Sequence, residues 1–189
     1  MNKEMQIRAF SQDFKTREEG GDIFISGYFS VFNSEYVLFP GGVEVIAPTA
    51  FDNALNDDIR ALINHDTTLV LGRTKAGTLL LSVDEKGLFG ESKINKNDQD
   101  AVNLYERVKR GDVSQCSFGF DILDEEKTEE NGNIKWTIKA VKLYEVSVVT
   151  FPAYEETSVS ARSDEFKEIQ KRKTEIFKND LLKKLKGSD

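Results

Sequence analysis

The sequence is poor in cysteine and histidine, with one residue of each among 189. A single cysteine cannot form an internal disulfide, and one cysteine with one histidine cannot supply the cluster of a zinc site. The chain also lacks the GxGxxG and P-loop motifs of nucleotide-binding folds. We therefore expect neither a metal nor a cofactor.

Two further absences limit the partners of the protein. No apolar run is long enough to span a bilayer, and the first residues do not resemble a signal peptide. The formal net charge is −7, and the basic residues are scattered instead of forming a basic face. These features predict a soluble intracellular protein with neither a membrane nor a nucleic acid as partner.

The length of the chain suits one domain with an appendage. Residues 1–162 have the pattern of a globular domain. From residue 163 onwards, charged residues surround apolar ones such as Phe166, Phe177 and Leu181. This pattern predicts an amphipathic helix with an imperfect apolar stripe. We expect this tail, residues 163–189, to pack on a partner, on a second copy in a dimer, or on the domain.

Short strands separated by turns dominate the globular part. The segments typical of strands are residues 5–10, 23–32, 43–46, 60–63, 69–71, 78–83, 88–94, 118–123 and 134–149. Residues 23–32 are apolar on both faces, as in a strand buried between layers. Asn131-Gly132 favours a type I′ hairpin turn between the last two strands. The spacing predicts an α+β fold with a small, mostly antiparallel β-barrel or curled sheet.

Two helices are predicted in the globular part. A short helix starts at Thr49, directly after Pro48, and ends near Asp57. The second helix has Asn97 as its N-cap and Gly111 as its C-cap.

Three polar residues stand where functional side chains are commonly presented. Ser117 follows a charged helical run and precedes a strand. His65, the sole histidine, follows the apolar run of residues 60–63, and Glu145 interrupts an apolar strand. A serine nucleophile, a histidine base and a carboxylate that orients the base need these residue types. We therefore predict His65, Ser117 and Glu145 as catalytic residues.

The residues alone leave other assignments open. Ser117 also fits a solvated serine, His65 a surface histidine, and Glu145 a solvent-facing position of a strand. Asp66 competes with Glu145 as the partner of His65, and Ser114 competes with Ser117 as nucleophile.

Two neighbours of these residues have ordinary interpretations. Cys116 is typical of a small buried apolar residue. Arg73 is a candidate oxyanion donor, but we favour a surface pair with an acid, because spacing alone does not indicate a preorganised donor.

Several segments, in their order and spacing, resemble the prohead proteases of tailed bacteriophages. They are Asn64-His65-Asp66, Leu71-Gly72-Arg73-Thr74, Gly77-Thr78-Leu79, Ser117-Phe118-Gly119-Phe120 and residues 145–154. Gly27-Tyr28, residues 31–33 and residues 48–51 extend the resemblance. It covers nearly the whole region from the first core strand to Tyr154.

The resemblance implies a serine endopeptidase that cleaves capsid-assembly proteins inside the immature shell. It also implies a β-barrel surrounded by helices, similar to the herpesvirus assemblins. His65 matches the family's histidine, Ser117 the serine of its Ser-x-Gly-Phe motif, and Glu145 the acidic position before Val-Ser. Ser114 falls outside that motif. The herpesvirus relatives use a second histidine as third member, which this chain lacks and the phage group does not require.

Partners and location follow from the same resemblance. It implies the major capsid protein and scaffold as substrates, the portal as a further candidate partner, a homodimer, and action inside the prohead in the host cytoplasm. The tail is expected to be scaffold-like or removable, with self-cleavage near the junction between domain and tail. The alternative is a non-catalytic capsid-assembly or scaffolding protein that acts through its C-terminal helix. A hydrolase of small esters is less favoured, because the Gly-x-Ser-x-Gly elbow is absent.

Overall fold

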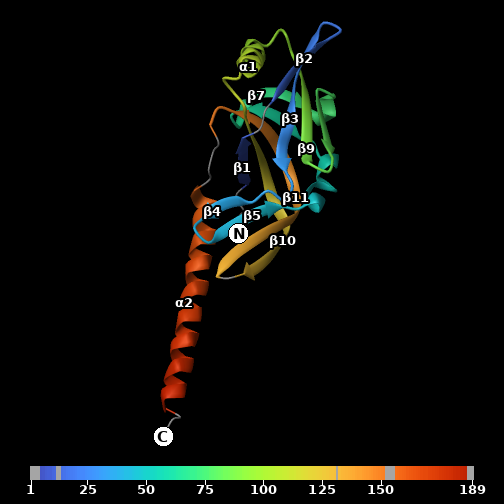
Figure 1. Cartoon of the computed structure of the whole chain (residues 1–189). Coiled ribbons are helices and arrows are strands. Elements are labelled where there is room, and N and C mark those ends of the chain that lie inside the picture. Colours follow the sequence, from blue (N-terminus) through green and yellow to red (C-terminus); the bar gives the residue numbers. More distant parts are fainter. Residues whose placement is uncertain (1–4, 12–13, 131, 152–155, 187–189) are drawn as a thin grey trace.

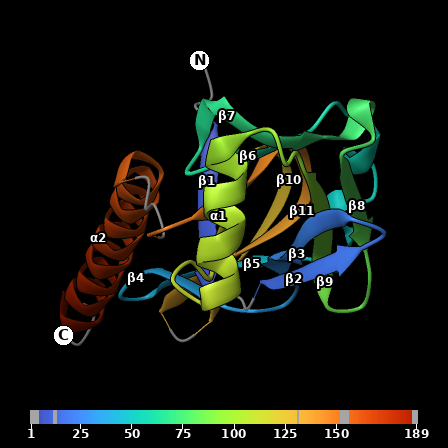
Figure 2. The same ribbon diagram turned by 90° about the horizontal axis from the view of Figure 1, so that it is seen from above.

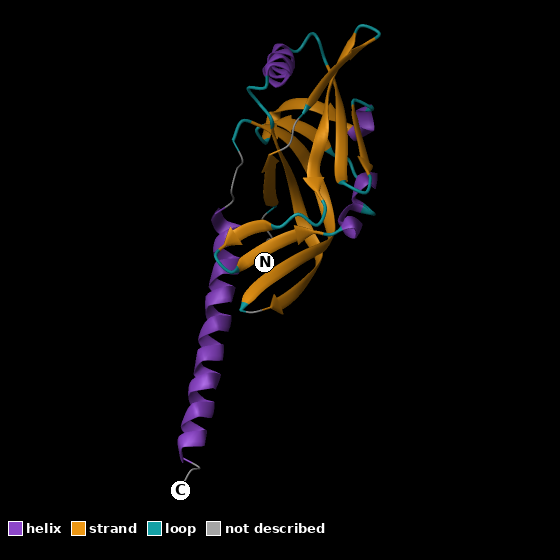
Figure 3. Cartoon of the chain, in the orientation of Figure 1, coloured by secondary structure: helices purple, strands orange, loops and turns teal. Residues whose placement is uncertain are grey.

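Two β-sheets carry the fold, and helices lie around them (Figure 3). The computed structural model describes residues 5–11, 14–130, 132–151 and 156–186. The larger sheet has seven strands: β1 (Gln6–Ser11), β4 (Tyr36–Phe39), β5 (Gly42–Ile46), β6 (Arg60–Ile63), β7 (Asp66–Arg73), β10 (Gln115–Glu130) and β11 (Asn133–Val149). The smaller sheet has four: β2 (Lys15–Glu19), β3 (Asp22–Val31), β8 (Leu79–Val83) and β9 (Gly87–Ile94).

The long hairpin of β10 and β11 forms the middle of the larger sheet (Figure 1). The predicted hairpin is confirmed, because Glu130 pairs with Asn133, and Gly132 has the positive φ, +81°, that a type I′ turn requires at its second central residue. Asn131 lies outside the described residues. β1 pairs antiparallel with the other edge of β10, while β5 and β6 pair parallel with the first and last parts of β11. The strands that carry the predicted site residues are therefore direct neighbours.

The α+β class is confirmed, but the strands that the structure describes do not close into the predicted barrel. β7 and β8, expected as consecutive strands of one curled sheet, belong to different sheets: β7 pairs with β6, and β8 pairs with β9. The short 3₁₀-helix η3 (Thr74–Ala76) joins them. Because each sheet therefore ends in its own edge strands, the structure is two open sheets around a shared apolar core. Within β3, buried and half-buried residues alternate. The prediction that both faces of this strand are buried equally was therefore wrong.

The best predicted helix is α1 (Gln99–Arg110), which packs on β2, β3, β7 and β9. Its C-cap is Gly111 as predicted, with a φ of +83° that suits glycine. Its N-cap is Asp98 and not Asn97, because the Asp98 side chain accepts from the backbone of Asp100 and Ala101.

The short helix predicted from Thr49 to Asp57 was wrong in type. The segment forms two 3₁₀-helices, η1 (Pro48–Phe51) and η2 (Ala54–Asn56). The backbone N–H of Asp52 donates to Thr49, three residues earlier. Asp52 and Asn53 lie between the two 3₁₀-helices, and both residue types favour turns over helix interiors. A continuous α-helix therefore does not form.

The C-terminal helix α2 (Glu156–Lys186) projects well beyond the sheets (Figure 1) and lies beside β4 when seen from above (Figure 2). Near its start, Arg162 is buried and the ring of Phe166 packs 5.4 Å from that of Phe39. Further along, large apolar side chains are exposed: Ile176, Phe177, Leu181 and Leu182. The helix continues through the predicted boundary between residues 162 and 163, and that division stays a prediction. No helix in the described ranges is long and apolar enough to cross a membrane.

Candidate active site

His65 lies in a tight turn that connects β6 to β7. Ile63 pairs with Asp66, which leaves Asn64 and His65 as the two central residues with φ values of +50° and +61°. Positive φ at both positions is the requirement of a type I′ turn, and Asn and His tolerate it better than most residues. Asn64 ties the turn to β11, because its backbone N–H donates to Val148 and its side chain accepts from Thr150. These hydrogen bonds fix the backbone position of His65 relative to β11.

The side chains of His65 and Glu145 are in direct contact. The Nδ1 atom of His65 lies 2.8 Å from Oε1 of Glu145, and the two side chains are only 15% and 7% exposed. A carboxylate accepts hydrogen bonds, so this contact favours the tautomer with the proton on Nδ1 and leaves Nε2 as an acceptor. Nε2 is buried and has no hydrogen-bond partner among the residues that the structure describes. A proton-accepting nitrogen is thus available at the site.

Ser147 joins the histidine and the carboxylate, although no pattern in the sequence singles it out. Its hydroxyl donates to Oε2 of Glu145 and accepts from the backbone N–H of His65 at 3.3 Å. The period of two along a strand places residues 145 and 147 on one face. However, that period does not reveal which neighbour lies against them.

Ser117 lies within β10, directly opposite Ser147 in the strand register. We expected it just before a strand, but it is the third residue of one. Opposite residues of an antiparallel pair share a face, so Ser117 lies on the face that carries Ser147 and Glu145. Ser117 is fully buried, and its hydroxyl donates at 3.0 Å to the backbone carbonyl of Arg8 in β1. The structure therefore brings His65 and Glu145 into contact and bonds Ser117 to β1 instead of to His65.

A glycine makes room for the carboxylate. Gly119 pairs with Glu145 across β10 and β11. A Cβ atom at Gly119 would lie 2.5 Å from Oε1 of Glu145, closer than van der Waals contact allows. The Gly in the Ser-x-Gly-Phe segment thus has a steric role in positioning the partner of His65.

The alternative residues have other contacts. Asp66 is exposed and accepts from the backbone and hydroxyl of Thr68, which lowers the pKa of Asp66 and makes it a turn cap. Cys116 is buried, as predicted, and its thiol donates to the carbonyl of Tyr28 at 3.1 Å. Ser114 is half-buried in the segment before β10.

Arg73 pairs with an acid, in agreement with the interpretation that we favoured. Its Nε and Nη2 atoms donate to the two carboxylate oxygens of Asp58 at 2.7 and 2.5 Å. This hydrogen-bonded pair, followed by the charge of Arg60, lowers the pKa of Asp58 from 3.8 to about 2.

The pair of Asp58 and Arg73 should make stability depend on pH in acid. Because the pKa of Asp58 is lower in the folded chain than its ordinary 3.8, its contribution is present above about pH 4 and is lost as the pH falls through about 2. We expect Asp58→Asn to lower the melting temperature at neutral pH, with the difference from wild type shrinking towards pH 2. Thermal melts across this range measure it. A difference that stays constant with pH would contradict the pairing.

An open cleft of about 500 Å³ lies beside the histidine and carboxylate. Residues from β6, β10, β11 and the His65 turn line it, among them Arg60, Leu62, His65, Asp121, Tyr144 and Glu145, together with Met5. A cleft of this size accommodates several side chains of a bound peptide. In the described part of the chain, no group of three or more His, Cys, Asp and Glu residues is arranged to hold a metal ion.

A buried histidine–carboxylate pair, with a serine on the strand that adjoins the carboxylate, has the components of a serine hydrolase site. Residues 11–172 match the family model described as Caudovirus prohead serine protease. The match covers most of the chain, and the chain belongs to this family.

Individual relatives agree with the family match. The chain is 31% identical over 154 residues to the prohead protease of Enterobacteria phage HK97, covering 79% of this chain and 64% of the relative. It is 26% identical over 157 residues to the prohead protease of Escherichia phage T5, covering 82% of this chain and 70% of the relative. The chain thus spans about two thirds of the length of these relatives.

A solved structure has a similar fold. The capsid assembly protease of bacteriophage T4 matches with a TM-score of 0.54 and 12% identity, over 79% of this chain and 98% of that one. At this identity the likeness concerns the fold alone.

Proposed function

We propose that the chain is a serine endopeptidase that cleaves capsid and scaffold proteins during phage prohead maturation. The observation that carries the proposal is the 2.8 Å contact of the only histidine with Glu145, whose strand β11 pairs with the strand of Ser117. Membership of the prohead serine protease family supports the same chemistry.

In the proposed mechanism, the hydroxyl of Ser117 turns from the carbonyl of Arg8 towards Nε2 of His65. His65 takes the hydroxyl proton as Oγ attacks the carbonyl carbon of the substrate, and backbone amides stabilise the oxyanion. Glu145 holds the Nδ1 proton and stabilises the imidazolium. The imidazolium then gives its proton to the leaving amine, and water hydrolyses the acyl-enzyme by the same route.

The proposed partners are the major capsid protein and scaffold as substrates, the portal, and a second copy of this chain. The place of action is the interior of the prohead in the host cell. The exposed apolar side chains of α2, including Ile176 and Phe177, support a protein partner for this helix. The acidic balance of the chain supports protein over nucleic acid as the binding partner.

The rival function is a non-catalytic assembly protein that acts through α2. This function does not explain the buried contact between His65 and Glu145. Burying these two polar side chains costs free energy, and a scaffold does not require them. The catalytic proposal gives that contact a purpose.

Co-expression with the major capsid protein from the same phage or prophage tests the function. We expect the wild-type chain to cleave the capsid protein, and also to cleave itself near the junction between its own domain and tail. Intact masses of both proteins measure the two cleavages. His65→Ala removes the proposed base and should leave both masses unchanged. Full-length capsid protein beside wild type, or equal shortening by both chains, would contradict the proposal.

A further inference from the structure

The proposed nucleophile is covered by a strand of its own chain. β1 runs antiparallel along the edge of β10, in register from Gln6 opposite Phe120 to Ser11 opposite Gln115. Ser117 is fully buried beneath this pairing, and the main-chain carbonyl of Arg8 accepts its hydroxyl proton at 3.0 Å. An extended peptide can bind a sheet edge in the same way, by adding one strand. β1 therefore holds a main-chain carbonyl where a substrate needs one.

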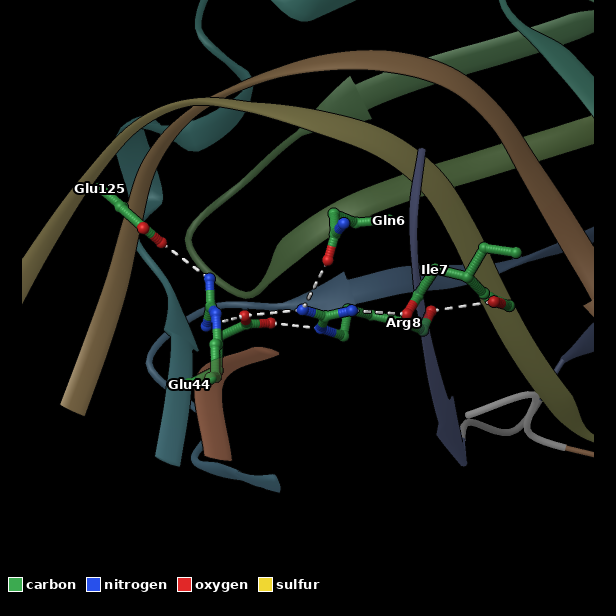
Figure 4. A network of polar contacts seen from close by, with 7 residues as sticks. Gln6, Ile7, Arg8, Glu44 and Glu125 are labelled. Atoms are coloured by element: carbon green, nitrogen blue, oxygen red, sulfur yellow. Dashed lines mark hydrogen bonds and ion pairs between the residues drawn. The ribbon is translucent and has the colours of Figure 1, made fainter. Parts of the chain in front are cut away.

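The side chain of Arg8 enters a buried acidic site. Its Nε and Nη2 atoms donate to the two oxygens of Glu44 at 2.5 and 2.9 Å, and the residues are 2% and 1% exposed (Figure 4). This two-point geometry fits a guanidinium, because its planar fork matches a carboxylate. The Arg8 guanidinium also lies 5.8 Å from the centre of the Phe120 ring.

The protein holds Glu44 in place from its other side. Arg162 of α2 donates to Oε2 of Glu44 and, at 2.7 Å, to Glu125. The carboxylate thus keeps one internal cation when Arg8 leaves, so the site stays partly neutralised while empty.

β1 lies at the limit of the family match. The match begins at residue 11, so residues 6–10 of β1 precede it. The strands that carry Ser117, Glu145 and Glu44, and the turn that carries His65, all lie inside it. Residues 6–10 of β1 therefore lie outside the matched region.

We infer that Glu44 determines specificity for a basic side chain, arginine above lysine, on the substrate residue whose carbonyl reaches Ser117, and that β1 occupies this subsite until substrate displaces it. The inference rests on the proposed protease function and names the substrate class of that site. While β1 is bound, the Ser117 proton goes to the Arg8 carbonyl and Nε2 of His65 has no partner among the described residues. In this arrangement the base is not engaged, so the occupied site is inactive.

Peptides made by digesting a bacterial extract with a glutamate-specific protease test the subsite. They are incubated with the full wild-type chain or with Ser117→Ala. Mass spectrometry then identifies the new peptide C-termini that form with the wild-type chain and not with Ser117→Ala. We expect arginine at most of them and lysine at fewer. Leucine or glutamate should be disfavoured on the order of 100-fold, since an unmatched group leaves Glu44 buried without its second cation. The wild-type profile alone decides this point.

Two matched variants locate the preference. Glu44→Gln should abolish the discrimination between arginine and leucine. Glu125→Gln, which removes a carboxylate from the same network at its contact with Arg162, should keep it. A third variant, Arg8→Ala, weakens the binding of β1 in the subsite. It should raise kcat/KM for arginine peptides, because the subsite is open in a larger fraction of the molecules. If Glu44→Gln does not fold, as judged by circular dichroism, the wild-type profile still tests the subsite.

The outcomes separate the two proposals. Ser117-dependent cleavage without basic enrichment, or unchanged kcat/KM in Arg8→Ala, would overturn the inference and leave the protease function standing. If no peptide is cleaved, the residue on the N-terminal side of the bond cleaved in the capsid protein, located from the masses of both fragments, gives the same reading: a basic residue supports the subsite, and any other residue overturns it. If neither peptides nor capsid protein are cleaved, both proposals fail together.

Discussion

Replacing Ser117 by Ala is expected to lower kcat for cleavage of the major capsid protein on the order of 10⁶-fold. The substitution removes the attacking oxygen and leaves only binding and oxyanion stabilisation. It should also remove the buried hydrogen bond to Arg8, at a cost to stability of about 1 kcal/mol. Timed mass spectra of the capsid protein measure the rate, and thermal melts show that the variant folds.

Ser114→Ala is the matched control for this prediction. Ser114 is half-buried three residues before Ser117, and the chemical change is the same. We expect its cleavage rate to stay within a few-fold of wild type. Full activity in Ser117→Ala with a loss in Ser114→Ala would move the nucleophile to Ser114.

Local signals in the sequence predicted the parts of the fold that depend on neighbouring residues. The apolar spacing before Gly111 indicated α1, and Asn131-Gly132 indicated the hairpin of β10 and β11. The turn at His65 was predicted as the end of a short apolar strand, and the structure has it there. In each case the responsible residues lie within a few positions of each other, so the pattern is visible in the chain itself.

Features that depend on distant partners could not be predicted. β7 and β8 belong to different sheets because β7 pairs with β6 and β8 pairs with β9. The residues between β7 and β8 do not indicate these pairings. The ion pair of Arg8 with Glu44 joins residues 36 positions apart, and β1 showed only the pattern of an edge strand. Ser117 is fully buried where β1 pairs with β10, and its own neighbours in the sequence do not indicate this partner strand.

The pairing of strands also separates the two candidate partners of His65. Sequence adjacency favoured Asp66, whereas the resemblance to the prohead proteases assigned Glu145. In the turn, however, Asp66 is exposed and bonds to Thr68, whereas parallel pairing of β6 with β11 brings Glu145 to Nδ1. Residues 80 positions apart thus meet, while the adjacent residue does not.

Glu145→Gln should therefore lower kcat by about 10⁴-fold, with KM nearly unchanged. The amide removes the charge that stabilises the imidazolium, and its NH₂ group competes for Nδ1 and favours the wrong tautomer of His65. Asp66→Asn is the matched control, since it neutralises the neighbouring acid, and should stay within a few-fold of wild type. Capsid cleavage rates at several substrate concentrations separate kcat from KM. A large loss in Asp66→Asn with normal activity in Glu145→Gln would transfer the orienting role to Asp66 and require a turn different from the one observed.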